Sequence, residues 1–154
     1  MTTSLDLIKK DLKHLDKIIE IYTEDLNEAD ILLKLTNKKI DMANAEHSGW
    51  KNYYHAKEVE VKYLKEYVRS KLDEVHGELW VKYTEKMDRV LTQKDKEQYI
   101  RREPIYLNIL SEFLKIQELH EQFVRLNESF TTRGYVLNNL TRLITSDTND
   151  WIIP

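Results

Sequence analysis

Apolar side chains in the middle of the chain recur at alternating intervals of three and four residues, which is the spacing of one stripe on an α-helix. No proline interrupts residues 1–103. The pattern predicts one long central helix over residues 27–86 and leaves open whether Gly49 breaks it. A helix of about 45 residues is roughly 65 Å long, so we expect other copies of the chain to cover part of the stripe. The stripe follows Leu33, Thr36, Ile40, Ala43, His47, Trp50, Tyr54, Lys57, Val61, Leu64, Val68, Lys71 (or neighbouring Leu72) and Val75.

An N-terminal helix is predicted over residues 1–26. It begins at Ser4 as its N-cap, and its apolar positions again step by three and four. Acidic residues around Asn27 indicate a break and a new helix start, because negative charge is favourable in the first turn of a helix. The apolar positions are Leu5, Ile8, Leu12, Leu15, Ile19 and Tyr22.

The last third of the chain is predicted as C-terminal helices over residues 104–146. Residues 87–103 are polar with weak periodicity and are predicted as a connecting loop. Pro104 suits the first turn of a helix, where its missing N–H would be unpaired anyway. The apolar set that follows is too wide for one helix face, so we expect contacts on two sides. A separate last helix is expected from about Thr132 to Thr145, and residues 147–154 form a tail that becomes apolar at Trp151–Ile153.

The composition supports this helical prediction. The chain has only three glycines and two prolines, far fewer turn residues than strand-and-turn folds require. There is no cysteine, which excludes disulfides and thiolate metal sites. Residues 1–19 contain no continuous apolar stretch, and no segment approaches the ~18 apolar residues of a membrane span. We therefore expect an all-α protein of the cytoplasm without membrane contact.

No pattern in the sequence indicates an enzyme. Gly-rich phosphate loops, nucleophile elbows and HExxH are absent. A four-helix di-iron site needs Glu-x-x-His motifs, whereas this chain has only Asp11/His14 and Asp73/His76. The histidine at position 47 lies in the apolar stripe and is interpreted as a packed polar core position. The acidic run at Glu24, Asp25 and Glu28 is interpreted as an exposed face. We expect no cofactor and no metal.

The charge distribution indicates where a phosphate-binding surface would lie. The net charge is −3, but residues 51–102 carry 13 Lys and Arg against 10 Asp and Glu, whereas both flanking thirds are acidic. Lys62, Lys65 and Arg69 lie at i, i+3 and i+7 on one helix face, interleaved with tyrosines. Lysines beside aromatic rings are a common means of holding single-stranded nucleic acid. An ordinary surface pair between Glu58 and Lys62 is the alternative interpretation.

Several ordered blocks resemble the UvsY-type recombination mediators of tailed phages, over roughly residues 50–140. A Lys/Tyr/Leu-rich helix, WKNYYHAKEVEVKYLKEYVRSKLDEV, runs into the aromatic end GELWVKYTEK. A polar connection and a helix follow, VLTQKDKEQYIRREPIYLNILSEFLKIQELHEQFVRLNESF, and then RGYVLNNL at positions 133–140. Residues 1–45 match the family poorly and are interpreted as containing a lineage-specific helix. Glu74, His76 and Glu78 stand where the family usually has basic residues, which leaves open which lysine would contact a strand.

The resemblance implies a function. Such proteins form ring-like homo-oligomers, thought to be hexamers or heptamers, and they do not hydrolyse nucleotide. They bind single-stranded DNA, contact the single-strand-binding protein and help a RecA-like recombinase to displace it. Carried over by position, the DNA-binding candidates are Lys62, Lys65, Arg69, Lys71, Lys82 and Tyr83. The oligomer-interface candidates are Ile109, Phe113, Ile116 and Phe123, which could equally be intrachain core. Arg133 and Asn139 are interpreted as structural.

Two other functions stay open on the sequence. The chain could be a helical structural or adaptor protein whose stripe binds a partner helix without binding DNA. A metal-dependent bundle enzyme is the weaker alternative. Salt-dependent binding to DNA distinguishes the first from a mediator, and elemental analysis distinguishes the second.

Overall fold

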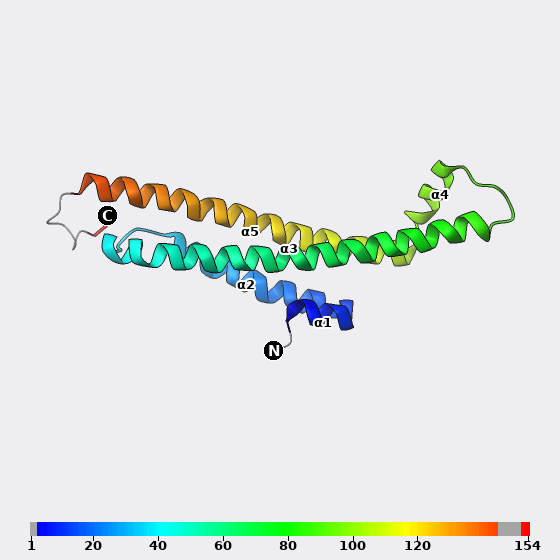
Figure 1. The fold of residues 1–154 in the computed structure, drawn as a ribbon, viewed down its shortest axis with the longest axis horizontal. Coiled ribbons are helices and arrows are strands. Elements are labelled where there is room, and N and C mark those ends of the chain that lie inside the picture. Colours follow the sequence, from blue (N-terminus) through cyan, green and yellow to red (C-terminus); the bar gives the residue numbers. More distant parts are fainter. Residues whose placement is uncertain (1–2, 145–151) are drawn as a thin grey trace. The chain divides into compact units, whose positions relative to one another are not determined.

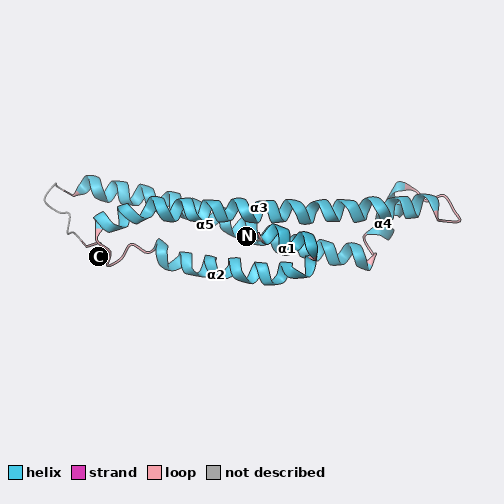
Figure 2. Ribbon diagram, turned by 60° about the horizontal axis from the view of Figure 1, so that its bottom comes forward, coloured by secondary structure: helices cyan, strands magenta, loops and turns pink. Residues whose placement is uncertain are grey.

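The computed structural model describes residues 3–144 and 152–154, and most of them are helical (Figure 1). In chain order the elements are α1 (Ser4–Lys10), the short 3-10 helix η1 (Leu12–His14), α2 (Leu15–Leu33), α3 (Ile40–Glu85), α4 (Gln93–Ile100) and α5 (Pro104–Leu143). The described residues form no strand beyond one isolated bridge between Lys39 and Ile152 (Figure 2). The predicted all-α fold is confirmed. No helix within the described ranges is long and apolar enough to cross a membrane.

The chain forms two compact units. Unit 1 consists of Met1–Leu15 and Lys62–Glu118, and unit 2 consists of Asp16–Val61 and Leu119–Pro154. Both long helices, α3 and α5, contribute residues to each unit.

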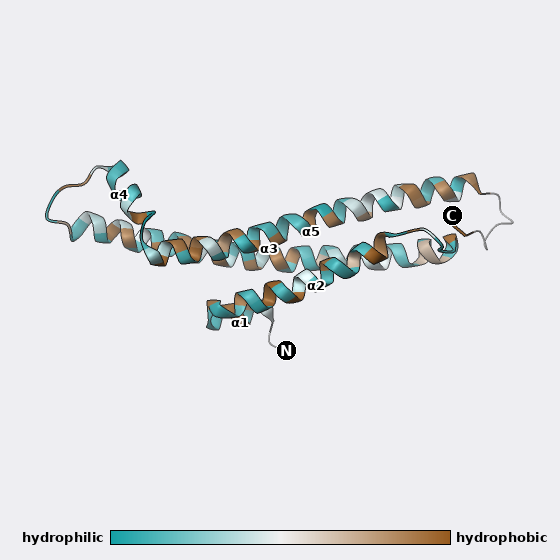
Figure 3. Cartoon of the chain, turned by 180° about the vertical axis from the view of Figure 1, so that it is seen from behind, coloured by the Kyte–Doolittle hydropathy of each residue, from teal (hydrophilic) through white to brown (hydrophobic). Residues whose placement is uncertain are grey.

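The central helix α3 is continuous over 46 residues, and Gly49 does not break it. Both apolar and polar residues occur along its length (Figure 3). Most of the predicted stripe is buried from Ile40 onwards, while His47, Trp50 and Lys57 are half-buried. The stripe positions that are buried are Ile40, Ala43, Tyr54, Val61, Leu64, Val68, Leu72 and Val75.

The break before α3 lies later in the chain than predicted. Helix α2 passes through Asn27 and ends at Leu33, so Leu33 and Thr36 lie outside α3. Tertiary contacts explain the difference, because Asp25 is not a free acidic residue at a helix start. Its carboxylate accepts a hydrogen bond from the Tyr53 hydroxyl at 3.3 Å and pairs with Lys57 at 3.8 Å. Asp25 is therefore half-buried, whereas Glu24 and Glu28 are exposed as predicted.

The helix predicted at the N-terminus is interrupted at Asp11, between α1 and η1. Thr3, not Ser4, caps α1 through a capping box with Asp6. The helix stops at Asp11, which has an extended backbone (φ −154°, ψ 122°) and accepts a hydrogen bond from the N–H of Lys13. An aspartate that bonds to the backbone two residues on favours a turn over a continuing helix.

Residues 87–103 contain a helix that the periodicity did not predict. Thr92 caps α4, and its hydroxyl oxygen accepts from the N–H of Asp95. The Asp95 side chain accepts in return from the Thr92 N–H at 3.3 Å. This T-x-x-D capping box is visible in the sequence and was the missed signal.

The C-terminal region is one helix, α5, in place of the two predicted. It continues through Gly134, which packs closely against the ring of His47 on α3 in unit 2. Arg133 is buried beside it, and its Nη1 donates to His47 Nδ1 at 3.0 Å. Burial, together with the positive charge of Arg133, lowers the pKa of His47. His47 is thus a packed polar position in its neutral form.

The three glycines provide a test of this close approach. We expect Gly49→Ala and Gly77→Ala each to raise the free energy of unfolding by about 0.5–1 kcal/mol, the usual difference in helix propensity. Apart from the chain neighbours and the helix's own nearby backbone, no atom of the described residues lies within 4 Å of a Cβ added at either position. At Gly134 the added Cβ would lie 2.7 Å from His47 Nε2, so Gly134→Ala should lower stability. Urea unfolding followed by circular dichroism measures all three, and a stabilised Gly134→Ala would contradict the packing.

Aromatic residues form the core of unit 2. The ring of Tyr22 meets that of Phe123 edge to face, with centroids 6.0 Å apart. Tyr54 stacks on Phe130 at 5.2 Å. The Tyr54 hydroxyl donates to the carbonyl of Asp25 at 3.2 Å, and burial, followed by the charge of Asp25, raises its pKa to about 12. These contacts join α2, α3 and α5 within the unit.

Candidate nucleic-acid interface

Two exposed cations lie in line on α3 within unit 1. Lys62 and Arg69 are seven residues apart, close to two full turns, so both project from one flank of the helix. The buried residues Leu64 and Val68 project from the other side of the helix, into the core. No described residue pairs with either cation, so their charges are available to an external anion.

The ion pair between Glu58 and Lys62, the alternative interpretation of the sequence, is not formed. Glu58 instead accepts a hydrogen bond from Asn127 Nδ2 at 2.5 Å and pairs with His55 at 3.8 Å. The ring of Tyr63 is 63% exposed but projects about 100° around the helix from Lys62, because the two residues are adjacent in the chain. Lys62 is therefore an exposed cation without a partner among the described residues, as a phosphate-binding surface requires.

The two other candidates on the body of α3 are less available. Lys65 is half-buried and lies 3.8 Å from Glu66. Lys71 follows Arg69 by two residues and therefore points to a different side of the helix. Its ammonium group contacts Glu74 at 2.6 Å, and this hydrogen bond raises the pKa of Lys71. The structure therefore groups Lys65 with Lys62 and Arg69, and separates Lys71 from them.

Lys82 and Tyr83 form an internal link at the end of α3. The Lys82 ammonium donates to Glu103 at 2.7 Å, and the Tyr83 hydroxyl donates to the same carboxylate oxygen at 2.5 Å. The hydrogen bonds from Lys82 and then Tyr83 lower the pKa of Glu103. The Tyr83 ring stacks on Tyr99 with centroids 5.4 Å apart. Both groups thus have partners within unit 1, and Tyr83 already stacks against a ring of the chain itself.

A second cluster of aromatic and charged groups lies where α3, α4 and α5 meet in unit 1. Trp80 is half-buried and stacks on His76, with centroids 6.1 Å apart. Lys96 from α4 lies over the Trp80 ring at 5.2 Å and donates to the Thr84 hydroxyl at 2.9 Å. His76 Nε2 lies 3.1 Å from a carboxylate oxygen of Glu97. Sequence reasoning did not find Lys96 because α4 was predicted as loop.

Comparison of the chain with models of known protein families, with curated proteins and with solved structures finds no match.

The predicted oligomer-interface residues divide into two groups. Ile116 and Phe123 are fully buried within the single chain, so both are core residues, as the alternative interpretation held. Ile109 and Phe113 are half-buried, and Ile109 packs against the cluster of Val75, Leu79 and Ile100.

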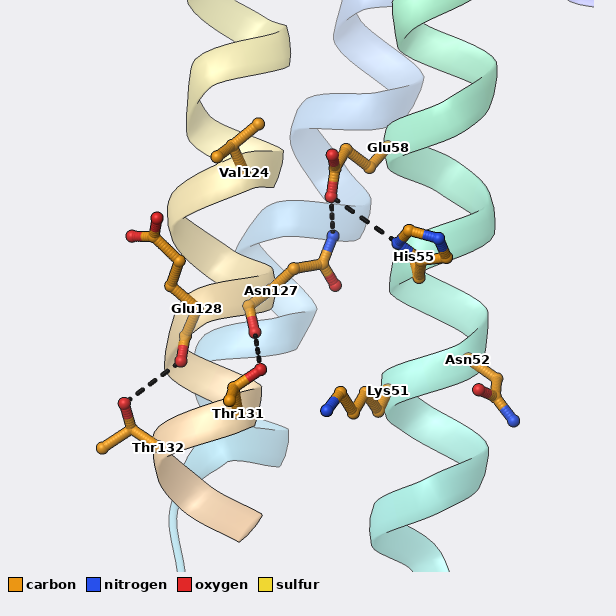
Figure 4. Close-up of a pocket in the computed structure, with 9 residues that line it drawn as sticks. All are labelled: Lys51, Asn52, His55, Glu58, Val124, Asn127, Glu128, Thr131 and Thr132. Carbon is orange, nitrogen blue, oxygen red and sulfur yellow. Dashed lines mark hydrogen bonds and ion pairs between the residues drawn. The ribbon is translucent and has the colours of Figure 1, made fainter. Parts of the chain in front are cut away.

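Unit 2 contains a separate polar groove of about 630 Å³ between α3 and α5 (Figure 4). Lys51 extends towards α5 across this groove, and Thr131 and Thr132 line the opposite side. Its lining carries both signs of charge, because Glu58 and Glu128 line it together with Lys51. Lys51 therefore lines a groove of unit 2 and does not belong with Lys62, Lys65 and Arg69 of unit 1. Across residues 3–144 and 152–154, no group of three or more His, Asp or Glu side chains is arranged to hold a metal ion.

Proposed function

We propose that this protein binds single-stranded DNA through the cationic flank of α3, formed by Lys62, Lys65 and Arg69. The observation that carries the proposal is that Lys62 and Arg69 are exposed, aligned and without a partner among the described residues. Lys65 is half-buried and lies 3.8 Å from Glu66, so Lys62 and Arg69 contribute most of the proposed attraction. Lys71, Lys82 and Tyr83 have carboxylate partners in Glu74 and Glu103 and contribute less.

The biological role that we propose is that of a recombination mediator. In this role, a homo-oligomer, a hexamer or heptamer by resemblance, holds a strand covered by single-strand-binding protein and helps a RecA-like recombinase to replace it. A flank of three cations binds a strand weakly, and repetition of that flank in an assembly would raise the overall affinity without new contacts. Weak, repeated binding suits a protein that must release the strand to another one.

Binding of the native chain to a fluorescent oligonucleotide tests this proposal. We expect fluorescence anisotropy to show binding that weakens as salt rises. If three cations per copy neutralise phosphates of a single strand, the slope of log K against log salt is about −2 per copy, and affinity falls roughly 15- to 20-fold between 50 and 200 mM salt. Absence of binding at 50 mM salt, or binding that salt does not change, would contradict the proposal.

A second candidate function is a helical adaptor protein that binds a partner helix. An exposed apolar row on α5 favours it, since Leu107 and Leu114 are exposed and, with Leu110, line a shallow groove of about 350 Å³ in unit 1. Apolar residues at i, i+3 and i+7 are the anchors by which one helix docks on another. This function predicts assembly without salt-dependent DNA binding, so the same anisotropy titration separates the two candidates.

A further inference from the structure

The turn between α2 and α3 holds an extended segment from the far end of the chain. The backbone N–H of Ile153 donates to the carbonyl of Lys38 at 3.0 Å, and the Ile153 carbonyl accepts from the N–H of Asn37 at 2.7 Å. Asn37 has a φ of 64°, a left-handed conformation that asparagine adopts more readily than most residues. The turn thus presents one backbone donor and one backbone acceptor to a single residue of the segment.

One buried side chain completes this contact. Ile153 is 8% exposed and packs against Ala43 and Leu137, with Leu35 and Leu140 at the edge of the cluster. Ile152 is 54% exposed, as expected when successive side chains of an extended segment point to opposite sides. The site therefore recognises extended backbone and one apolar side chain. None of these contacts depends on which copy of the chain supplies the segment.

The docked segment is joined to α5 by a short stretch of chain. Helix α5 ends at Leu143, and residues 144–151 precede Ile152. A stretch of this length spans at most about 28 Å when fully extended. The residues of the segment that make these contacts follow α5 in the chain, whereas Leu137 and Leu140 of α5 belong to the site that receives it. A second copy could therefore supply the segment.

We propose that residues 152–154 of one copy dock on the α2–α3 turn of a second copy, so that chains assemble by exchanging this segment. Exchange reproduces between two chains the contacts already made within one, so it needs no additional surface. The small size of the contact makes the bound segment replaceable. Where copies are concentrated, a neighbouring segment competes with the intrachain one. The proposal does not rest on DNA binding.

Cysteine cross-linking tests the exchange directly, because the chain has no cysteine of its own. Lys39 and Ile152 oppose each other in the antiparallel bridge, and both are exposed. Opposed residues of this kind have Cα atoms about 4.5–5.5 Å apart, within the range of a disulfide. Chains carrying Lys39→Cys are mixed with chains carrying Ile152→Cys in a glutathione redox buffer. Non-reducing gels and mass spectrometry then measure the disulfide-linked heterodimer.

Two controls distinguish docking of the segment from random collision between chains. Pairing Ile152→Cys with Glu20→Cys, an exposed position on α2 of the same unit, measures random collision. We expect at least five times more heterodimer from the Lys39→Cys pair. We also expect a return to the control level when Ile153→Asp is added to the Ile152→Cys chain. A heterodimer yield no higher than the control overturns the proposal, whether or not a Lys39→Cys/Ile152→Cys double variant closes within one chain. The mixture contains no DNA, so its outcome is separate from that of strand binding.

Discussion

Reversing the charge of Lys62, Lys65 and Arg69 together should abolish measurable binding to a fluorescent single-stranded oligonucleotide. Replacing the three cations by glutamate removes every attraction of the proposed flank and adds repulsion from phosphates. We expect affinity to fall by roughly two orders of magnitude at 50 mM salt. Lys62 and Arg69 are exposed and without partners among the described residues, and Lys65 is half-buried beside Glu66, so we expect at most a small change in helical content. Anisotropy measures the binding, and circular dichroism measures the fold.

A second triple variant controls for net charge. Lys9, Lys10 and Lys13 are exposed residues near the N-terminus, and changing them to glutamate alters the net charge by the same amount. We expect this variant to retain most of the native affinity. If both triple variants lose binding equally, the interaction depends on overall charge and not on the flank of α3. Native affinity in the Lys62, Lys65 and Arg69 variant would exclude the flank as the binding surface.

Truncating Phe130 to alanine should give the largest loss of stability in unit 2. The ring is fully buried and stacks on Tyr54 with centroids 5.2 Å apart and planes inclined by 18°. Removing a buried phenylalanine costs about 3–5 kcal/mol, from lost apolar burial and from the cavity left behind. Tyr54 would also lose the ring on which it stacks. Urea unfolding at fixed protein concentration measures the change, since assembly alters apparent stability.

Two further variants show whether the loss comes from the buried ring. Phe130→Leu keeps an apolar side chain in the core and should cost less than the alanine change. Tyr135→Ala removes an aromatic ring from the same helix at a position that is 68% exposed, and should change the free energy of unfolding by less than about 0.5 kcal/mol. Equal losses for Phe130→Ala and Tyr135→Ala would contradict the position of Phe130 in the core.

The most regular segments of the chain were predictable because their pattern is local. Spacing by three and four residues fixes one helix face wherever the period persists, and α3 buries that face from Ile40 to Val75. The same rule placed Lys62, Lys65 and Arg69 on one flank without tertiary information. The predicted break near Asn27 failed because it rested on acidic residues alone. Contacts from Tyr53 and Lys57 to Asp25, distant in the chain, support a continuous α2 there.

The sequence by itself determined the all-α class, the long central helix and the aligned cations, since each follows from residue spacing on a single helix. Only the tertiary structure decided which charges remain free, because the partner of Lys82 is Glu103, 21 positions away in the chain. It also decided that α5 continues through Gly134, where His47 of another helix fills the space beside the glycine. The docking of Ile153 at the α2–α3 turn was likewise decided by the tertiary structure. Contacts between distant residues depend on how helices pack, which periodicity does not specify.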